Sequence, residues 1–295
     1  MILITGASGF IGSHLRDKLG DARLVSRKKI IGRNTFIINS LDSFVDWSLA
    51  LEGVDCIVHL ASVAHRSASL DELNEVNVLA TTNLAIQAAK SGVKKIVYLS
   101  SIGVNGSNTQ YGQTFSNLSD TAPWNPYSMS KMVAEKQLSA ICLTNNIELA
   151  ILRPPLVYGK AAPGNYSLLL KLIKKVRFLP FGLCDNKRSF ISVYNLVDLI
   201  VFLCQTKNDV AGVFLPSDNE DVSTKQFLRA VSTSFSRKII MVPMPKSLMK
   251  TIFSMAGKKN LYFQLFGDLV IEDLELVKLG WAPKYSMQQS LSKSK

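Results

Sequence analysis

The chain opens with Met1-Ile2-Leu3-Ile4-Thr5-Gly6-Ala7-Ser8-Gly9-Phe10-Ile11-Gly12, the stretch that decides its fold. The first five residues form an apolar run typical of a buried strand, and a helical pattern follows over residues 11–19. Between them stand three glycines spaced three residues apart. A glycine-rich turn between a strand and a helix lets the backbone approach a pyrophosphate and points amide donors and the positive helix end at it. The stretch therefore predicts a parallel α/β sheet that binds a dinucleotide at the end of its first strand.

Strands and helices alternate along the first half of the chain. We expect strands at residues 2–5, 22–26, 34–38, 55–60, 94–99 and 147–152, and helices at residues 11–19, 43–51, 71–90 and 127–145. This alternation is typical of a doubly wound parallel sheet with helices on both faces. Beyond residue 159 the pattern loosens, and we expect a smaller C-terminal substrate lobe. The predicted division is 1–159 plus 188–216 for the dinucleotide-binding domain and 160–187 plus 217–295 for the lobe.

Tyr127 and Lys131 stand four residues apart in the helix expected over 127–145, so their side chains share one helical face. A lysine ammonium beside a phenol favours the phenolate, and we expect it to lower the pKa of Tyr127 from about 10 toward neutral pH. A tyrosine with a lowered pKa can exchange a proton with a substrate hydroxyl or carbonyl. The pair alone also fits an ordinary helix with a half-buried aromatic and a solvated charge, so its chemistry depends on its surroundings.

Further motifs follow in a consistent order along the chain. They are Thr5-Gly6-x-x-Gly9-x-x-Gly12, His59-Leu60-Ala61-Ser62, Asn77-Val78, Ser100-Ser101, Tyr127-x-x-x-Lys131, Arg153-Pro154-Pro155-Leu156-Val157-Tyr158-Gly159, Arg188-Ser189-Phe190-Ile191-Ser192-Val193 and Leu279-Gly280-Trp281-x-Pro283. Together they resemble the extended short-chain dehydrogenase/reductase superfamily, in its nucleotide-sugar epimerase, dehydratase and 4-ketoreductase branch of the bacterial polysaccharide-biosynthesis type. The resemblance covers nearly the whole chain and implies a Rossmann domain with a smaller C-terminal lobe for the nucleotide sugar.

The resemblance also implies roles for individual residues. Tyr127 would transfer the proton, Ser101 would polarise the reacting oxygen, and Lys131 would hold the cofactor ribose. The cofactor-binding residues that it implies are Gly6, Ser8, Gly9, Phe10, Ile11, Gly12, Ser26, Arg27, Ser40, Leu41, Leu60, Ala61, Ser62, Asn77, Ser100, Tyr127, Lys131 and Pro154. The substrate-binding residues are Ser101, Asn165 at the diphosphate, Phe181 in the uracil-binding strand, and Arg188 as a phosphate clamp, for which a surface salt bridge is the alternative.

Cofactor choice depends on the end of the second strand, where an acidic residue would accept hydrogen bonds from the ribose 2'-hydroxyl of NAD. This chain has Ser26-Arg27-Lys28 there and no acid. A hydroxyl and two cations can hold a 2'-phosphate, so NADP(H) is favoured and NAD(H) is the alternative. Arg27 could instead stack on the adenine or face solvent. Asn39-Ser40-Leu41 is a further departure, since the family usually carries Asp before its adenine contact.

The chemistry implied by the resemblance is hydride transfer at C4 of a UDP-sugar. Because a reductase consumes external NAD(P)H, the non-acidic Ser26-Arg27-Lys28 segment favours a UDP-4-keto-6-deoxy-N-acetylhexosamine 4-reductase in O-antigen or capsule biosynthesis. The alternative is a UDP-glucose/UDP-N-acetylglucosamine 4-epimerase, which regenerates a tightly held cofactor. A non-catalytic dinucleotide-sensing protein is a remote alternative, since such proteins usually lose the Tyr/Lys pair.

The composition sets outer limits on the function. No apolar run reaches the roughly 18 residues that span a bilayer, and a strand that starts at Met1 leaves no room for a signal peptide, so we expect a cytoplasmic protein. The four cysteines lack the spacing of a disulfide framework or a zinc site, and no metal is expected. His14, His59 and His65 are each expected to be structural, although His65 and Arg66 could also reach the sugar.

The net charge of +12 is the bulk property that these motifs explain least. Such a charge could favour nucleic acid, an anionic membrane surface or anionic substrates. The basic residues form small clusters at residues 27–29, 171–177 and 258–259, and no nucleic-acid-binding motif accompanies them. The expected partners are therefore a UDP-sugar and no nucleic acid. The family commonly forms homodimers through the helices expected here at 71–90 and 127–145, which leaves a homodimer open.

Overall fold

The computed structural model describes residues 1–64 and 68–294. Its centre is a seven-stranded sheet in the order β10-β6-β5-β4-β1-β2-β3, in which neighbouring strands run parallel. The strands are β1 (Ile2–Thr5), β2 (Arg23–Ser26), β3 (Thr35–Ile37), β4 (Cys56–His59), β5 (Lys95–Leu99), β6 (Glu148–Leu152) and β10 (Gly212–Phe214). The predicted doubly wound α/β fold is confirmed.

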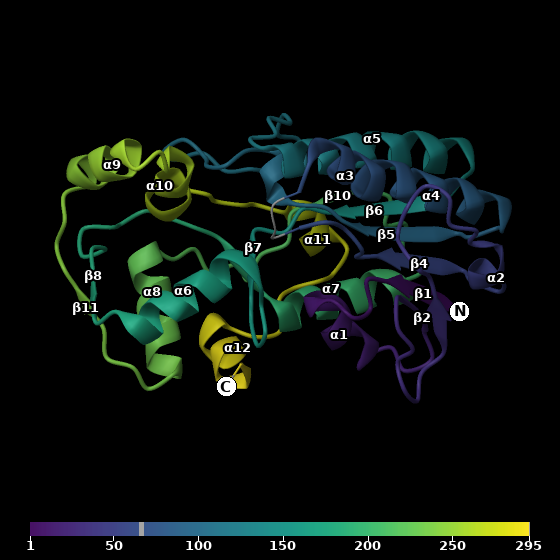
Figure 1. Ribbon diagram of the computed structural model, residues 1–295, viewed down its shortest axis with the longest axis horizontal. Helices are drawn as coiled ribbons and strands as arrows, with labels where there is room; N and C mark the ends of the chain where they lie inside the picture. Colours follow the sequence, from purple (N-terminus) through teal and green to yellow (C-terminus); the bar gives the residue numbers. More distant parts are fainter. Residues whose placement is uncertain (65–67, 295) are drawn as a thin grey trace.

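Helices cover both faces of this sheet (Figure 1). One face packs against α1 (Phe10–Arg16) and α7 (Val193–Gln205), and the other against α2 (Ser48–Leu51), α4 (Ala80–Lys90) and α5 (Pro126–Thr144). Successive strand residues point to opposite faces, so Leu3 and Ile4 belong to different cores although they are neighbours in sequence. The strands are apolar on both sides because neither face of the sheet meets water.

The first turn of the chain lies where the strand order reverses, because β1 stands between β2 and β4. Gly6 has a φ of +70°, and a Cβ there would lie 2.8 Å from the Ala61 nitrogen in the loop after β4. A Cβ on Gly12 would lie 2.2 Å from the Gly6 oxygen. Glycine at both positions therefore lets the turn, α1 and the loop after β4 approach closely. Ligands of open parallel sheets bind at the carboxyl ends of the strands at this kind of reversal.

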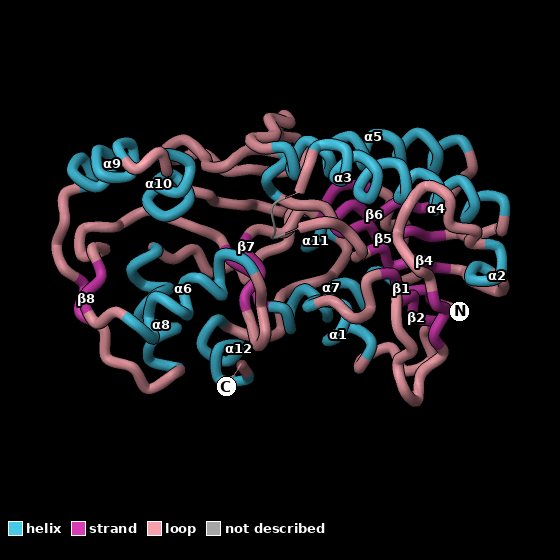
Figure 2. Tube along the Cα trace, in the orientation of Figure 1, coloured by secondary structure: helices cyan, strands magenta, loops and turns pink. Residues whose placement is uncertain are grey.

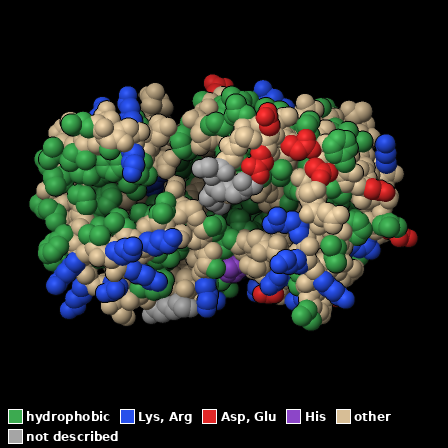
Figure 3. Space-filling view, in the orientation of Figure 1, with side chains coloured by type: hydrophobic (Ala, Val, Ile, Leu, Met, Phe, Trp, Pro, Cys, Tyr) green, Lys and Arg blue, Asp and Glu red, His purple; other side chains and the backbone are tan. Residues whose placement is uncertain are grey.

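A smaller group of elements packs beside one end of the sheet (Figure 2). It comprises α6 (Gly164–Lys175), β8 (Phe178–Leu179), α8 (Thr224–Ser234), β11 (Ile240–Met241), α9 (Lys246–Met255), α10 (Lys259–Phe266) and α12 (Met287–Lys293). Its separate core contains Phe190 and Phe227, whose stacked rings lie 4.1 Å apart. On the face shown in Figure 3, Lys and Arg side chains gather over this smaller group, whereas acidic side chains gather over the helices of the main sheet.

Two elements differ in detail from the sequence prediction. The helix expected over 71–90 consists of α3 (Leu70–Leu73), a π-helical segment η1 (Asn74–Leu79) and α4. π-Helical segments are rare in proteins overall, and those that occur are often at functional sites. The strand β9 (Phe190–Ser192) pairs with β7 (Leu156–Tyr158) outside the main sheet, so β10 alone returns from the segment 188–216 to that sheet. Across the described residues, every helix is too short or too polar to cross a bilayer.

Gly12→Ala tests the close packing of α1 on the first turn. The new Cβ would meet backbone atoms of Gly6 and Ala7 at 2.2 and 2.8 Å, so the helix must move away from the turn. Overpacking of this kind costs about 1–3 kcal/mol of folding free energy. We expect a lower unfolding temperature and weaker dinucleotide binding, measured by scanning fluorimetry and by cofactor titration. Gly20→Ala is the control, because its Cβ would lie 3.6 Å from the flexible Arg33 side chain, and equal losses in both variants would contradict this account.

Candidate active site

The loops after β1 and β4 are joined through buried polar side chains. Thr5 Oγ1 and His59 Nδ1 lie 2.7 Å apart, and His59 Nε2 lies 2.9 Å from the Thr81 hydroxyl. The Ala61 amide donates to the Thr5 hydroxyl at 3.3 Å. Burial, assisted by the charge of Lys131, lowers the pKa of His59 to about 3, so this imidazole is neutral and holds the two loops together. Leu60, Ala61 and Ser62 are half-buried in the loop after β4, while Ser8 and Gly9 are exposed in the first turn.

Asn77 lies in η1 and is fully buried. Its carboxamide oxygen accepts from the Val63 amide at 2.8 Å. Its nitrogen donates to the Val63 carbonyl at 3.2 Å and to the Ser130 hydroxyl at 3.0 Å, which uses both of its hydrogens. The sequence placed Asn77 among the cofactor contacts, whereas in the structure it fixes the loop after β4 against α5.

Tyr127 lies in the first turn of α5, which is capped by Asn125 through a 2.7 Å hydrogen bond from the Ser128 amide. The Ser62 hydroxyl forms a hydrogen bond with its phenol. Burial raises the pKa of Tyr127 to about 12, and the bond to Ser62 opposes this rise. The prediction that Lys131 lowers this pKa is therefore wrong for the cofactor-free chain. The physical reason is that the ammonium lies 6.0 Å from the centre of the Tyr127 ring and has another partner.

That partner of Lys131 is the last carbonyl of β5. The ammonium donates to the Leu99 oxygen at 2.8 Å and lies 4.6 Å from the centre of the Tyr98 ring. Burial lowers the pKa of Lys131 to about 7, and the charge of Glu135 opposes this fall. Lys131 therefore titrates near neutral pH, one helical turn from Tyr127 and at the carboxyl end of a central strand.

Ser101 follows β5 and caps a short 3₁₀ helix, η2 (Ile102–Val104). Its hydroxyl oxygen accepts from the Gly103 amide at 3.1 Å, which leaves the hydroxyl hydrogen for donation to another group. A Cβ on Gly103 would lie 2.3 Å from Ser128 Oγ, 3.1 Å from Trp124 Nε1 and 3.3 Å from Ser101 Oγ. The Ser101 hydroxyl after β5, the Trp124 indole and the Ser128 hydroxyl in α5 therefore surround Gly103, and Ser128 directly follows Tyr127 in the chain.

A buried ion pair supports these residues from behind. Glu135 accepts from Arg153 Nε at 3.0 Å and from Arg153 Nη2 at 2.5 Å. The Ser100 hydroxyl donates to the same carboxylate, and Arg153 Nη1 donates to the Asn105 oxygen at 3.1 Å. Asn105 in turn donates to the carbonyls of residues 119–120. The network joins β5, β6, η2 and α5, and it uses the hydroxyl of Ser100 that the sequence assigned to the cofactor.

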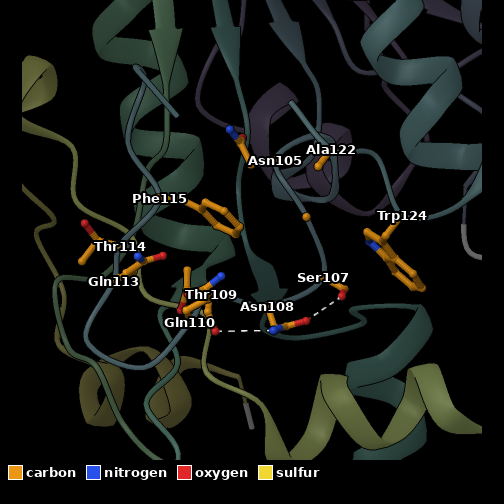
Figure 4. A pocket seen from close by; sticks show the side chains of 11 residues that line it. Asn105, Ser107, Asn108, Thr109, Gln110, Gln113, Thr114, Phe115, Ala122 and Trp124 are labelled. Atoms are coloured by element: carbon orange, nitrogen blue, oxygen red, sulfur yellow. Dashed lines mark hydrogen bonds between the residues drawn. The ribbon is translucent and has the colours of Figure 1, made fainter. Parts of the chain in front are cut away.

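A polar pocket of about 350 Å³ opens beside this network. It is lined by Asn105, Gly106, Ser107, Asn108, Thr109, Gln110, Gln113, Thr114, Phe115, Ala122 and Trp124. Figure 4 shows Phe115 pointing toward the middle of this group, with Trp124 on the other side of it. Since Trp124 also borders Ser101 through Gly103, the pocket adjoins the Ser101 side chain. Carboxamides, hydroxyls and aromatic rings in one concavity suit a ligand rich in hydroxyl groups.

Arg188 is about nine-tenths buried, and its guanidinium donates at 2.8 Å to the carbonyl of Gly267, which borders the pocket residue Asn108. Burial lowers the pKa of Arg188 to about 10, and the charge of Asp268 opposes this fall. Within residues 1–64 and 68–294 its guanidinium forms no ion pair. A buried guanidinium without a carboxylate partner fits the predicted phosphate clamp better than the alternative of a surface salt bridge.

The other two expected substrate residues are placed differently. Asn165 is exposed in the first turn of α6, where its amide donates to the Gln264 oxygen at 3.1 Å. Phe181 is buried in the core of the smaller group, and its ring stacks on Phe266 with centres 5.1 Å apart. Because the core uses its ring, Phe181 could meet a uracil only through its backbone. His65 and Arg66 lie outside the described residues.

The remaining expected cofactor residues line the carboxyl ends of β1, β2 and β3. Ser26 is buried at the end of β2 and accepts from the Lys28 amide at 3.3 Å, while Arg27 is exposed. Ser40 donates to Asp42, so an acid does stand next to Leu41, although not at the family's usual position. Phe10 and Ile11 are half-buried in α1, and Pro154 is buried with its carbonyl accepting from η2.

Comparison with known proteins agrees with this geometry. Residues 2–214 match the model of the NAD dependent epimerase/dehydratase family. The chain belongs to this family. It is 34% identical to the UDP-glucose 4-epimerase of Vibrio cholerae, over 99% of this chain and 94% of that protein. It is 31% identical to the N-acetyl-alpha-D-glucosaminyl-diphospho-ditrans,octacis-undecaprenol 4-epimerase of Escherichia coli O157:H7, over 84% of this chain and 76% of that protein.

Solved structures share the fold of this epimerase/dehydratase. The UDP-glucose 4-epimerase of Thermus thermophilus in complex with NAD has a TM-score of 0.76 at 21% identity and covers 99% of this chain and 97% of its own. MoeE5 in complex with UDP-glucuronic acid and NAD has a TM-score of 0.78 at 20% identity, with the same coverage. These likenesses show a common architecture that spans both the main sheet and the smaller group of elements.

The residues of this epimerase/dehydratase fit a bound dinucleotide. Side chains at positions 6 and 12 would fill the space between the first turn, α1 and the loop after β4, and both positions carry glycine. The amino end of α1 then faces the carboxyl edge of the sheet, where a pyrophosphate would be stabilised by backbone amides and the helix dipole. Tyr127 and Lys131 lie at the neighbouring edge, beyond β5.

Sequence reasoning missed Glu135, Trp124 and, apart from residues 105 and 106, the residues that line the pocket. Glu135 carries a detectable signal, because it follows Lys131 by four residues and so lies on the same helical face. Trp124 and residues 107–115 carry none, because their approach to the site depends on a long connection between β5 and α5 that has no periodic pattern.

Lys131→Met tests the lowered pKa of Lys131. Its pKa falls from 10.5 to about 7 on burial, so between these values the unfolded chain binds more protons than the folded chain. Stability then rises with pH in that window. In cofactor-free protein, the unfolding free energy of the wild type relative to the variant should increase by about 2 kcal/mol between about pH 7 and about pH 9. Urea unfolding at both pH values measures it, and a constant difference would contradict the lowered pKa.

Proposed function

We propose that this chain is a UDP-hexose 4-epimerase that works with retained NAD. The observation that carries the proposal is the position of Ser101 beside a pocket large enough for a hexose ring, with Lys131 bound to the end of the strand that Ser101 follows and Tyr127 one helical turn before it. Two relatives above 30% identity are named as 4-epimerases, and one of them matches this chain almost from end to end. Both relatives favour the epimerase over the 4-reductase that the segment 26–28 had suggested.

Tyr127 and Ser101 act on the same oxygen of the substrate. In the oxidising half of the reaction, the Tyr127 oxygen takes the proton of the sugar O4 while hydride leaves C4. Ser101 donates a hydrogen bond to O4 and stabilises the charge that develops there. When bound, NAD supplies the acceptor and then the donor of that hydride. After the keto sugar turns its other face, C4 regains the hydride and Tyr127 returns the proton to O4, so the cycle involves no net oxidation.

Tyr127 must be ionised before it can take a proton. A phenol beside a neutral amine has the same net charge as a phenolate beside an ammonium, so moving the proton from Tyr127 to Lys131 changes no net charge in the buried site. The pKa of Lys131 is about 7, and half of the lysines can therefore accept a proton at neutral pH. Glu135 opposes the fall of this pKa and so favours the ammonium that accompanies the phenolate.

The substrate is held at two points in this proposal. The pocket between residues 105 and 124 takes the hexose, and Arg188 takes the diphosphate through its fork of donors. A diphosphate is shared by UDP-sugars and by the polyprenol-linked sugar named for the Escherichia coli relative. The pocket of about 350 Å³ and the buried guanidinium serve either carrier, and we propose the UDP-sugar because the Vibrio cholerae relative matches over a larger share of both chains.

The finer choice of dinucleotide rests on the end of β2. Ser26 and Arg27 provide no acid for a ribose 2'-hydroxyl, yet an epimerase regenerates its cofactor in place and has no need of a reductant pool. We therefore propose NAD, bound tightly enough to remain on the purified protein. Mass spectrometry of the dinucleotide released by heat or acid identifies it. Release of NADP instead would favour the 4-reductase.

Tyr127→Phe tests the proton-transfer role. The wild type should interconvert UDP-glucose and UDP-galactose, or their N-acetylated forms, without added NAD(P)H, as followed by chromatography. The variant should lose about 100- to 10,000-fold in kcat, the contribution of a positioned acid-base group. Tyr111→Phe is the control, because Tyr111 is 96% exposed, and it should keep full activity. Undiminished turnover by Tyr127→Phe would refute the role, and turnover only with a 4-keto sugar and NAD(P)H would refute the epimerase.

Arg188→Lys tests the diphosphate contact. The variant keeps a positive charge but loses the planar fork, and a charge-assisted hydrogen bond contributes about 1.5–3 kcal/mol. We expect KM for the UDP-sugar to rise on the order of tenfold or more, with kcat reduced less. Arg229→Lys, on the exposed side of α8, is the matched control. An unchanged KM in Arg188→Lys would place the diphosphate elsewhere.

A further inference from the structure

The positive charge of this chain is concentrated in the smaller group of elements. Between Asp221 and Asp268 the sequence has eight Lys or Arg residues and no Asp or Glu. Between Glu148 and Asp185 it has six Lys or Arg residues and again no acid. Among these cations, Arg153 pairs with the buried Glu135, and Lys225 pairs with Asp185. The proposed contacts to a dinucleotide and a UDP-sugar use none of the cations in these two segments.

Five of these cations meet at one hollow, about 310 Å³ in volume, at the carboxyl end of α6. They are Lys174, Lys175, Arg177, Arg237 and Lys238. Arg237 donates to the Lys174 carbonyl at 3.1 Å, which draws the segment after α8 against α6. In the part of the chain that the structure describes, none of the five forms an ion pair, and no acidic side chain lines the hollow. Such an arrangement of like charges favours an anionic partner.

Exposed apolar side chains continue from this hollow. Phe178 on β8 and Ile240 on β11 are 59% and 43% exposed, and these two strands pair directly after the basic segments. Five residues beyond β11, α9 exposes Leu248, Ile252 and Met255 on one helical face, whereas the exposed Lys246 and Lys250 lie on the opposite side of the helix. A helix with an exposed apolar stripe and lysines on its other side is typical of segments that lie in a membrane interface.

The basic and apolar side chains lie at the outer end of the molecule. Figure 1 places β8, β11 and α9 at the end farthest from β1 and β2, and Figure 3 shows Lys and Arg side chains next to a broad apolar area there. The candidate active site lies at the carboxyl ends of the sheet strands, toward the main sheet. A partner at the outer end would therefore leave the site beside β5 uncovered.

We propose that this outer face docks on the surface of a bilayer that contains anionic phospholipid. The cations would meet the phosphate groups while Phe178, Ile240 and the α9 stripe enter the headgroup region. A second copy of the chain fits less well, because a two-fold contact would bring the same positive clusters together. A nucleic acid fits less well, because it would leave the apolar stripe of α9 against phosphates. The proposal is independent of the proposed 4-epimerase activity.

Vesicle sedimentation of the full chain tests the docking. We expect binding to vesicles of phosphatidylcholine with about 30% phosphatidylglycerol, weakening as salt is added, and little binding to phosphatidylcholine alone. Replacing Lys174, Lys175 and Arg177 by Gln should weaken binding on the order of 100-fold, given the contribution of each cation near an anionic surface. Replacing Leu248 and Ile252 by Ser should also weaken vesicle binding, but the remaining binding should depend on salt as strongly as that of the wild type.

The control variant replaces Lys18, Lys90 and Lys136 by Gln, which removes the same charge from exposed positions of the main domain. It should bind vesicles as the wild type does, and unfolding temperatures should show that all variants are folded. Equal loss in the control, or equal binding to both kinds of vesicle, would overturn the proposal. Light scattering of the wild type and of the Leu248→Ser/Ile252→Ser variant provides a second check. If the wild type is a dimer that does not bind vesicles, and the variant is a monomer, then this face is a contact between two copies of the chain and the proposal is wrong.

Discussion

One buried carboxylate, that of Glu135, holds the candidate active site together. It receives two hydrogen bonds from Arg153, which follows β6, and one from Ser100, which follows β5. Burying a guanidinium beside an ammonium would cost several kcal/mol without a carboxylate nearby. The same carboxylate opposes the fall in the pKa of Lys131. Both the position of α5 against the strand ends and the charge of its lysine therefore depend on this ion pair.

The two arginines that are buried within residues 1–64 and 68–294 show how one type of side chain acquires different roles. Arg153 is fully engaged by a carboxylate and a carboxamide, so it fixes structure. Arg188 has a backbone carbonyl as its hydrogen-bond partner and a charge that Asp268 offsets only in part, so it favours an anionic ligand. We propose that the smaller group of elements uses cations in two ways, a buried one for the substrate diphosphate and exposed ones for an anionic surface.

Much of the fold could be predicted from local patterns. The expected strands and helices of the first half match β1 to β6 and α1 to α5 to within a few residues, because apolar periodicity and glycine spacing act over short stretches. The candidate site was predicted only in part. Tyr127 and Lys131 share one face of α5, and Lys131 bonds to the end of the strand that Ser101 follows. Asn77 and Ser100, however, are used by buried hydrogen bonds and Phe181 by the core. Segments distant in sequence supply those partners, so no local pattern indicates them.

The sequence by itself determined the parallel sheet, the glycine-rich turn and the identity of the candidate proton-transfer pair, because each depends on residue types at short, regular spacing. Only the tertiary structure decided the state of that pair. Burial raises the pKa of Tyr127 and lowers that of Lys131, against the expectation from their spacing, because desolvation depends on everything packed around a group. The structure likewise decided that the pocket between residues 105 and 124 adjoins Ser101, since a long connection without periodicity folds back to form it.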